Sequence, residues 1–280
     1  MEYKDVQLTR KTSEFTKRVF SAIPLAIAVL LIDYWGGWVF ELAAALLGFV
    51  FYWEGLLILK VDKLRQYLGQ FLYILLCLSV FAFVAGWLPL YAFYAWLAVL
   101  MCVLVVLSRK RMSALWLFFY SAAFALSLIV IRGDTPGGAI AVLYLLLVVW
   151  VSDSFAYFGG KLLKGPKLMP KISPNKTWSG ALTGLFFSGL FGALFALTED
   201  VPLLTSLLLG LVLSMIAQIG DIAESAFKRR YNVKDSGRII PGHGGVMDRV
   251  DGLSLAAFCL ALFVIARQKS GFAFEAMFLW

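Results

Sequence analysis

Long apolar segments, separated by short polar connections, make up most of this chain. These segments lack the apolar–polar alternation of a half-buried strand, and a helix needs roughly 20 apolar residues to cross a membrane. A membrane offers no partners to backbone N–H and C=O groups, so spanning segments form helices. The pattern therefore predicts about nine transmembrane helices, at Val19–Ile32, Trp38–Leu59, Phe71–Ala85, Leu90–Leu107, Ala114–Ile131, Ala139–Phe158, Ala181–Leu197, Val201–Ile219 and Val250–Ile265.

The composition agrees with a membrane protein. Hydrophobic residues make up 61% of the 280 residues and charged residues 15%, whereas soluble domains contain about 25% charged residues. The cysteines Cys77, Cys102 and Cys259 lie far apart in apolar segments, so we expect packing roles and neither a zinc site nor a disulfide framework. We predict an all-α, polytopic integral membrane protein whose residues 1–280 form a single transmembrane domain.

The distribution of positive charge predicts an orientation. In membrane proteins, Lys and Arg collect in cytoplasmic connections. Of the 25 Lys and Arg residues, 22 lie in the N-terminal segment and in alternate connections between the predicted helices. This split predicts a cytoplasmic N-terminus and a C-terminus on the outside. It also accounts for the net charge of +8 without a nucleic-acid partner.

Acidic residues gather in the last cytoplasmic connection, residues 220–249. If the eighth helix continues beyond the membrane surface, Asp221 shares one face with Glu224, Ser225 and Lys228. At the other end of the connection, Asp248 and Asp251 begin the ninth helix, where the helix dipole alone would favour one carboxylate. Carboxylates that are brought together favour a bound cation, and hard oxygen ligands suit Mg²⁺. We therefore expect Asp221 and Asp248 to bind a metal, with Asp251 as a further candidate.

Glycines and basic residues in the same connection predict phosphate binding. Glycine allows the backbone to come close to a ligand, and consecutive N–H groups can bind an anion. The residues concerned are Gly237, Gly242, Gly244, Gly245, Lys228, Arg229, Lys234, Arg238 and Arg249. Two alternatives stay open: Arg249 forms a structural ion pair with its neighbouring aspartates, and His243, the single histidine, is either a structural hydrogen-bonding residue or a phosphate contact.

A second polar connection spans residues 159–180. Its end, KISPNKTWSG, precedes the seventh helix, where Thr177 or Ser179 could cap the helix N-terminus. Hydroxyl, amide and ammonium groups beside a helix N-terminus make an anion site. The candidates are Lys171, Ser173, Asn175, Lys176 and Thr177.

Two ionisable residues fall within predicted helices, Asp153 in the sixth and Glu54 in the second. Such residues are costly in lipid and are candidates for function. Both lie near the cytoplasmic ends of their helices. We therefore predict a polar cavity within the helix bundle that opens to the cytosol.

These residues resemble the phosphatidate cytidylyltransferase (CDP-diacylglycerol synthase) family. Its signature S-x-[apolar]-K-R-x4-K-D-x-G-x2-[apolar]-P-x-H-G-G-[apolar]-x-D-R-[apolar]-D is matched at every specified position by SAFKRRYNVKDSGRIIPGHGGVMDRVD, residues 225–251. DSFAYFGG, PKISPNKTWSG and GDIAES are similar to further family segments. Ser179 and Gly252 depart from the usual glutamate and serine. The motifs fall in residues 139–265, the expected catalytic helices and loops, whereas residues 1–131 resemble the family only weakly.

The resemblance implies transfer of CMP from CTP to phosphatidate, with Mg²⁺ as cofactor, in a multi-pass protein of the cell inner membrane whose active site faces the cytoplasm. It implies catalytic roles for Asp221, Asp248, Asp251, Lys228 and Arg249, and metal binding by Asp221, Asp248, Asp251 and Asp153. Expected substrate contacts are Ser173, Asn175, Lys176, Thr177, Ser225, Arg229, Lys234, Asp235, His243, Gly244 and Gly245. CTP, phosphatidate and membrane lipids are the expected partners, and the family also allows a homodimer.

Two other functions remain open. A related enzyme would use CTP with another lipid phosphate or a polyprenol. A transporter of anionic lipids or nucleotides would use Asp153 and Glu54 as a coupling path, but transporters often carry internal repeats, and none is evident here.

Overall fold

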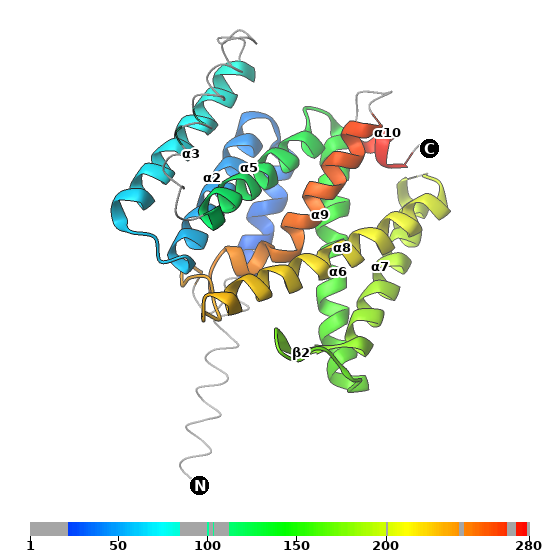
Figure 1. Ribbon diagram of the computed structural model, residues 1–280. Helices are drawn as coiled ribbons and strands as arrows, with labels where there is room; N and C mark the ends of the chain where they lie inside the picture. Colours follow the sequence, from blue (N-terminus) through cyan, green and yellow to red (C-terminus); the bar gives the residue numbers. More distant parts are fainter. Residues whose placement is uncertain are drawn as a thin grey trace.

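The computed structural model describes residues 22–84, 100, 103, 112–199, 201–240, 244–267 and 273–278. Helices dominate these residues (Figure 1). After a helix at Ala22–Trp35 come α2 (Gly37–Ile58), α3 (Lys63–Val84), α5 (Met112–Arg132), α6 (Pro136–Leu163), α7 (Trp178–Glu199), α8 (Leu203–Arg230), α9 (Met247–Ala266) and the short α10 (Ala273–Phe278). Two short strands, β1 (Lys167–Met169) and β2 (Ser173–Thr177), pair antiparallel between α6 and α7.

Seven of the described helices, α2, α3 and α5 to α9, are long and apolar enough to cross a membrane. This confirms the prediction of a mostly helical, polytopic membrane protein. The exposed side of α7 fits a lipid environment, since Leu182, Phe186, Leu190 and Leu194 recur at four-residue intervals on it. The helix Ala22–Trp35 overlaps the first predicted helix, but Leu90–Leu107 lies largely outside the described residues. The count of nine helices and the orientation of the termini therefore stay predictions.

Helix ends differ from the predicted ones mainly on the polar side of the bundle. α6 continues five residues beyond Phe158, and α8 runs on from Ile219 to Arg230, as the shared face of Asp221 and Lys228 suggested. A hydrophobicity pattern marks where a helix leaves the apolar layer, not where its hydrogen-bonded turns end. The β1–β2 hairpin and α10 are additions that the all-helical prediction did not contain.

Helices α6, α7 and α8 pack against one another through small residues. A Cβ atom on Gly184 of α7 would lie 2.7 Å from the Ser152 carbonyl oxygen of α6, and one on Gly210 of α8 would lie 2.5 Å from the Ser188 carbonyl oxygen of α7. Small residues allow this close approach, which is how helices associate in membranes. A hydrogen bond from Tyr144 Oη to the Ser206 carbonyl oxygen (2.6 Å) adds to this packing.

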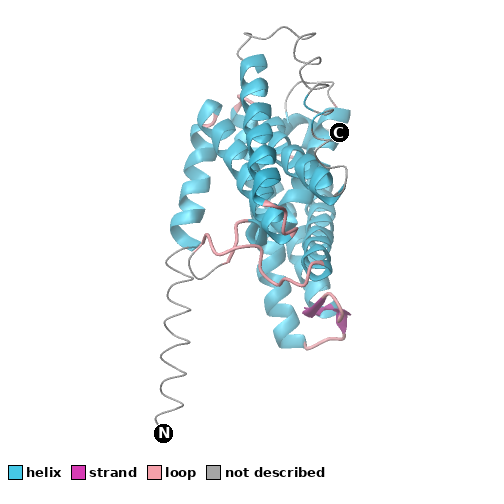
Figure 2. Cartoon of the chain, turned by 60° about the vertical axis from the view of Figure 1, so that its left-hand side comes forward, coloured by secondary structure: helices cyan, strands magenta, loops and turns pink. Residues whose placement is uncertain are grey.

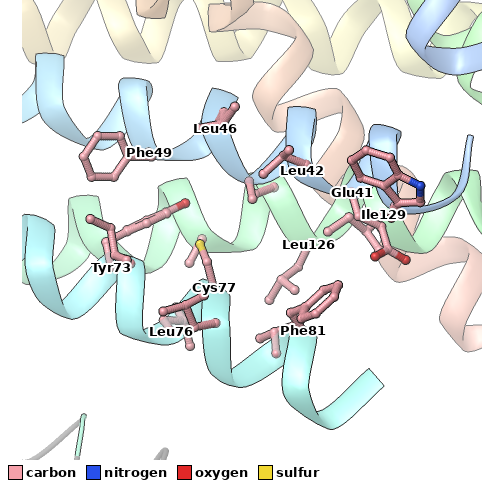
Figure 3. A pocket seen from close by; sticks show the side chains of 17 residues that line it. Glu41, Leu42, Leu46, Phe49, Tyr73, Leu76, Cys77, Phe81, Leu126 and Ile129 are labelled. Atoms are coloured by element: carbon pink, nitrogen blue, oxygen red, sulfur yellow. The ribbon is translucent and has the colours of Figure 1, made fainter. Parts of the chain in front are cut away.

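Helices α2, α3 and α5 form a second group, in which α5 contacts α6 of the first group, and α9 packs against both α5 and α8. The buried rings of Tyr52, Tyr73 and Phe118 pack with centroids 5.3–5.5 Å apart at its centre. Beside them lies an apolar cavity of about 540 Å³, and Figure 3 shows the side chains from α2, α3 and α5 that surround it. Its lining contains a single charged residue, Glu41, among the described residues.

The polar segments of the chain lie toward one end of the bundle. In Figure 1, α8 crosses the bundle obliquely and leads to the loop before α9, and the hairpin lies at the lower end of α6 and α7. Figure 2 shows the hairpin at the lower end from a second direction. The two connections in which the sequence predicts chemistry are therefore attached to neighbouring helices, since α7 packs on α8 and α8 on α9.

Candidate active site

A polar cavity of about 700 Å³ lies where the ends of α6 and α8, the start of α7 and the hairpin meet. It brings together residues that the sequence predicted separately, from three segments of the chain. These are Asp153 of α6, Asn175, Lys176 and Thr177 of β2, and Asp221 of α8. The prediction of a polar cavity lined by Asp153 is thus confirmed, whereas Glu54, which was expected in the same cavity, does not line it.

An ion pair between Lys176 Nζ and Asp221 Oδ2 crosses this cavity and joins β2 to α8. Both side chains are about a quarter exposed, so the pair is reachable from water. Asp153 interacts electrostatically with Asp221, Lys176 and Arg249. Opposite charges therefore alternate across the cavity, and a polyphosphate with a cation could replace the internal ion pair.

The hairpin is held so that its polar residues face the helices. Thr177 Oγ1 accepts a hydrogen bond from Gly180 N (3.1 Å), which confirms Thr177 as the cap of α7. Ser179 Oγ accepts from Gly165 N (3.0 Å), so this residue ties the start of α7 to the segment after α6. Arg229 Nε donates to the Ile172 carbonyl oxygen (3.3 Å) and links the hairpin turn to α8. Ser173 begins β2 but is not among the residues that line the cavity.

A second charged group surrounds Lys228, which is buried. Its Nζ lies 2.6 Å from Asp248 Oδ1 and 3.1 Å from Glu224 Oε1. Asp248 Oδ2 accepts hydrogen bonds from Ser236 N (2.9 Å) and Gly245 N (3.1 Å). Asp248 is therefore fully engaged by the loop before α9 and by α8, whereas both carboxylate oxygens of Glu224 are buried without an aligned hydrogen-bond donor among the described residues.

Asp251, one turn after Asp248, is the acidic residue that connects the two groups. It interacts electrostatically with Asp221, Glu224 and Asp153. The sequence predicts Asp153, Asp221 and Asp251 as metal ligands, and this assignment stays a prediction. Among the described residues, however, no three Asp, Glu, His or Cys side chains are close enough together to hold a metal ion.

The remaining predicted contacts lie at the end of α8 and on the α8–α9 loop. Ser225 Oγ donates to Asp221 Oδ1 (3.4 Å), while Lys234 and Asp235 are exposed on the loop. Gly244 adopts φ +89°, a conformation that favours glycine, and its Cβ would lie 3.2 Å from Asp248 Oδ2. His243 lies outside the described residues.

Sequence reasoning missed part of the cavity lining, namely Lys161, Lys164, Lys167 and Gln218. The three lysines recur every third residue in KLLKGPK, and their charge looked like a topological signal. Their regular three-residue spacing could have indicated that the three lysines face the same cavity. Glu54 is fully buried and is not among the residues that line the cavity.

Comparison with known proteins shows the family of the chain. The model of the cytidylyltransferase family matches residues 16–266. The chain is 51% identical over 146 residues to a phosphatidate cytidylyltransferase of Brucella abortus biovar 1 (strain 9-941), covering 52% of this chain and 54% of the relative. It is 38% identical over 150 residues to a phosphatidate cytidylyltransferase of Rickettsia prowazekii (strain Madrid E), covering 50% of this chain and 66% of the relative.

A third relative, a phosphatidate cytidylyltransferase of Rickettsia conorii (strain ATCC VR-613 / Malish 7), is 43% identical over 126 residues, which cover 42% of this chain and 55% of the relative. The chain thus spans about half the length of the curated relatives it matches. The match of the family model is longer and includes both helix groups of the fold.

Proposed function

This chain belongs to the cytidylyltransferase family, and from that premise we propose that it transfers CMP from CTP to phosphatidate for phospholipid synthesis. An oxygen of the lipid phosphate attacks the α-phosphorus of CTP, the bond from that phosphorus to the bridging oxygen breaks, and pyrophosphate leaves. The products are CDP-diacylglycerol and pyrophosphate. The observation that carries the proposal is the polar cavity in which lysines of the hairpin region face Asp153 and Asp221 at the end of the helices.

Charge is the main obstacle in this reaction, because both substrates are anions. Four lysines line the cavity: Lys161, Lys164, Lys167 and Lys176. Cationic groups aimed at the transferring phosphoryl group stabilise the charge that develops in the transition state. We assign the triphosphate and the lipid phosphate to these lysines together with Asn175 and Thr177, and the leaving pyrophosphate to Arg229, Lys234 and Arg249.

The attacking group needs no strong base. A phosphate monoester carries between one and two negative charges at neutral pH, since its second pKa is about 6. The protein therefore has to orient the lipid oxygen and exclude water rather than remove a proton. Lys176 fits that role, because its ammonium group already reaches from β2 to α8 across the cavity.

The carboxylates fit a divalent cation by their chemistry. Asp153, Asp221 and Asp251 interact electrostatically with one another, and Glu224 has buried oxygens without an aligned donor in the described part of the chain. Hard oxygen ligands of this kind suit Mg²⁺. Because no three of the described carboxylates lie close enough together to hold an ion by themselves, one or two of Asp221, Asp251 and Asp153 would bind it together with substrate phosphates. Asp248 would contribute if its bond to Lys228 were exchanged. Bound there, Mg²⁺ would neutralise charge on the phosphates.

The membrane arrangement supports a site at the cytoplasmic surface of the inner membrane. Phosphatidate lies in the bilayer and CTP in the cytosol, so the reacting atoms have to meet at the interface. The cavity lies where α6 and α8 extend beyond their predicted apolar segments, beside the lysine-rich hairpin. Basic residues at this depth also attract anionic lipid headgroups.

The test uses the purified full chain in detergent with phosphatidate, α-labelled CTP and Mg²⁺, and follows label into the lipid phase. We expect transfer by the wild type, none with EDTA, and a decrease of about 10²–10³-fold in Asp221→Asn. Asp134→Asn is the matched control, because Asp134 is exposed and is not among the residues that line the cavity. Unchanged transfer by both Asp221→Asn and Asp248→Asn at limiting Mg²⁺ would overturn the metal assignment.

The same assay separates the proposed acceptor from its alternatives. With CTP fixed, phosphatidate is compared with an ether-lipid phosphate and a polyprenol. Faster transfer to one of these would identify a related lipid cytidylyltransferase. No transfer to any acceptor by folded protein would contradict the proposed reaction and favour transport.

A further inference from the structure

The described residues of the loop between α8 and α9, 231–240 and 244–246, form no helix or extended strand. Its described residues contain one isolated bridge, in which Ile240 N donates to the Gly244 carbonyl oxygen (2.9 Å) and Gly244 N to that of Ile240 (3.2 Å). The functional groups that it positions, Asp248 above all, therefore need anchors outside the loop. The strongest anchor comes from α2, far away in the sequence.

Glu54 of α2 binds both ends of this loop at once. Its Oε2 accepts hydrogen bonds from Ser236 Oγ and from Met247 N, both at 2.8 Å, and its Oε1 accepts from Val246 N at 3.1 Å. Glu54 is 0% exposed, Ser236 5% and Met247 3%. A buried carboxylate with three donors is a strong and directional contact.

The same carboxylate caps α9. Val246 and Met247 are the N-cap and first residue of this helix, and no side chain of its own N-cap accepts a hydrogen bond. The first N–H groups of a helix have no partner within it and favour a negative charge. Glu54 supplies both the acceptor and the charge from another helix.

Two glycines of the signature pack against Glu54. A Cβ atom on Gly237 would collide with Glu54 Oε1, and one on Gly245 would collide with Ser236 Oγ and lie 2.6 Å from Glu54 Oε2. The close approach of the loop to Glu54 therefore requires glycine at both positions. This gives part of the glycine-rich pattern a reason that is independent of any phosphate.

The anchored residues are also the ones that orient Asp248. The Ser236 hydroxyl donates a hydrogen bond to Glu54, and the Ser236 backbone N–H donates one to Asp248 Oδ2. Gly245, whose N–H also reaches Asp248 Oδ2, directly precedes Val246, which donates to Glu54. Loss of the Glu54 bonds would release both donors of Asp248 together.

We propose that Glu54 is a positioning residue of the active site, which fixes the loop so that Asp248 is presented in one orientation for the transfer of CMP. This role rests on the proposed function, because it assigns Glu54 to the rate of that reaction. Glu54 is not a catalytic residue, since it does not touch the polar cavity.

The test compares Glu54→Gln with wild type in the full chain in detergent. The amide replaces one acceptor oxygen by an NH₂ group that faces donors, so at least one buried donor loses its partner. We expect kcat per folded protein to fall by about 10- to 100-fold, with a smaller change in KM for CTP. Glu54→Asp keeps both oxygens and should restore part of the rate. Glu41→Gln, a change on the same helix beside the apolar cavity, should leave kcat unchanged.

Hydrogen exchange of the peptide covering residues 236–247 provides a readout without substrate. We expect faster exchange in Glu54→Gln than in Glu41→Gln. Wild-type exchange together with wild-type kcat would overturn the inference, and so would reduced thermal stability with unchanged kcat per folded protein. An inactive wild type would overturn the proposed function and the kinetic part of the inference, while exchange would still show whether Glu54 holds the loop.

Ser236→Ala keeps the inference testable if Glu54→Gln does not fold, because it removes one of the three bonds. We expect a loss of kcat of about 3- to 10-fold. In the double variant with Glu54→Gln, the two losses should combine to less than their product, since both act through one contact. Independent, multiplying losses would contradict a shared anchor.

Discussion

Lys228 and Lys176 form ion pairs in different surroundings. Lys228 is 8% exposed and lies between Asp248 and Glu224, whereas Lys176 and Asp221 are about a quarter exposed. Removal of one partner from a buried ion pair leaves an uncompensated charge, while a pair in contact with water contributes little to stability. We therefore expect the Lys228 ion pairs to contribute mainly to stability and the Lys176 ion pair mainly to the proposed activity.

The matched variants Lys228→Met and Lys176→Met test this difference. Lys228→Met should destabilise the protein by about 3–5 kcal/mol, because it leaves Asp248 and Glu224 without their shared cation. Lys176→Met should change stability by no more than about 1 kcal/mol and still lose most of its activity. Unfolding in detergent and the label-transfer assay measure the two effects. Equal loss of stability in both variants would contradict the assignment.

At the scale of residues, the sequence predicted which residues line the polar cavity better than it predicted their hydrogen-bond and ion-pair partners. Asp153 stood out because an ionisable residue within a membrane helix is costly. Asp221 stood out because it shares a helix face with other polar residues, and Lys176 because it lies beside a helix N-terminus. The contact between Glu54 and Ser236 was beyond such reasoning, because the two residues are 182 positions apart and no local pattern links them. His243 and the metal ligands stay predictions.

At the scale of helices, the contact of α6 with α7 depends on where glycine faces a backbone rather than a side chain. A Cβ on Gly184 would lie 2.7 Å from the Ser152 carbonyl oxygen, which cannot move without the helix. A Cβ on Gly189 would lie equally close to Leu211 Cδ2, the end of a flexible side chain of α8. The same Cβ distance of 2.7 Å therefore predicts a steric penalty at Gly184 but not at Gly189.

Gly184→Ala should lower stability by about 1–3 kcal/mol through overpacking. Gly189→Ala should be neutral or stabilising, because Leu211 can rotate away and alanine favours a helix by up to about 1 kcal/mol. The comparison is made by thermal unfolding of the two variants in the same detergent. A larger loss in Gly189→Ala would mean that Leu211 is fixed.

Hydrophobicity predicted where the helices lie, but it did not predict where they end. The continuation of α8 to Arg230 could be predicted, because Asp221, Glu224 and Lys228 share a face only in a helix. The hairpin could not, since Lys167–Met169 and Ser173–Thr177 are short, include Pro174 and lack alternation. Its shape comes from contacts with α7 and α8.

For the whole molecule, the distribution of Lys and Arg predicts a testable orientation. In a variant without native cysteines, Lys63→Cys and Asp134→Cys place thiols on opposite predicted sides, and both positions are exposed. A membrane-impermeant thiol reagent should label Asp134→Cys in intact bacterial cells and Lys63→Cys only after permeabilisation. The reverse result would invert the topology, and labelling of both would contradict an odd number of helices between them.

The anchor on α2 also has a consequence for how the chain is made. A ribosome delivers Glu54 to the membrane long before Ser236 and Met247 exist, so the newly inserted carboxylate has none of its three donors. Burial of an unpaired charge among apolar groups is costly, so the N-terminal helices alone lack the contacts that stabilise the Glu54 carboxylate. All three donors are present only after the loop and the start of α9 have been synthesised. A chain that stops before α9 would therefore leave the Glu54 carboxylate without the backbone donors of Val246 and Met247.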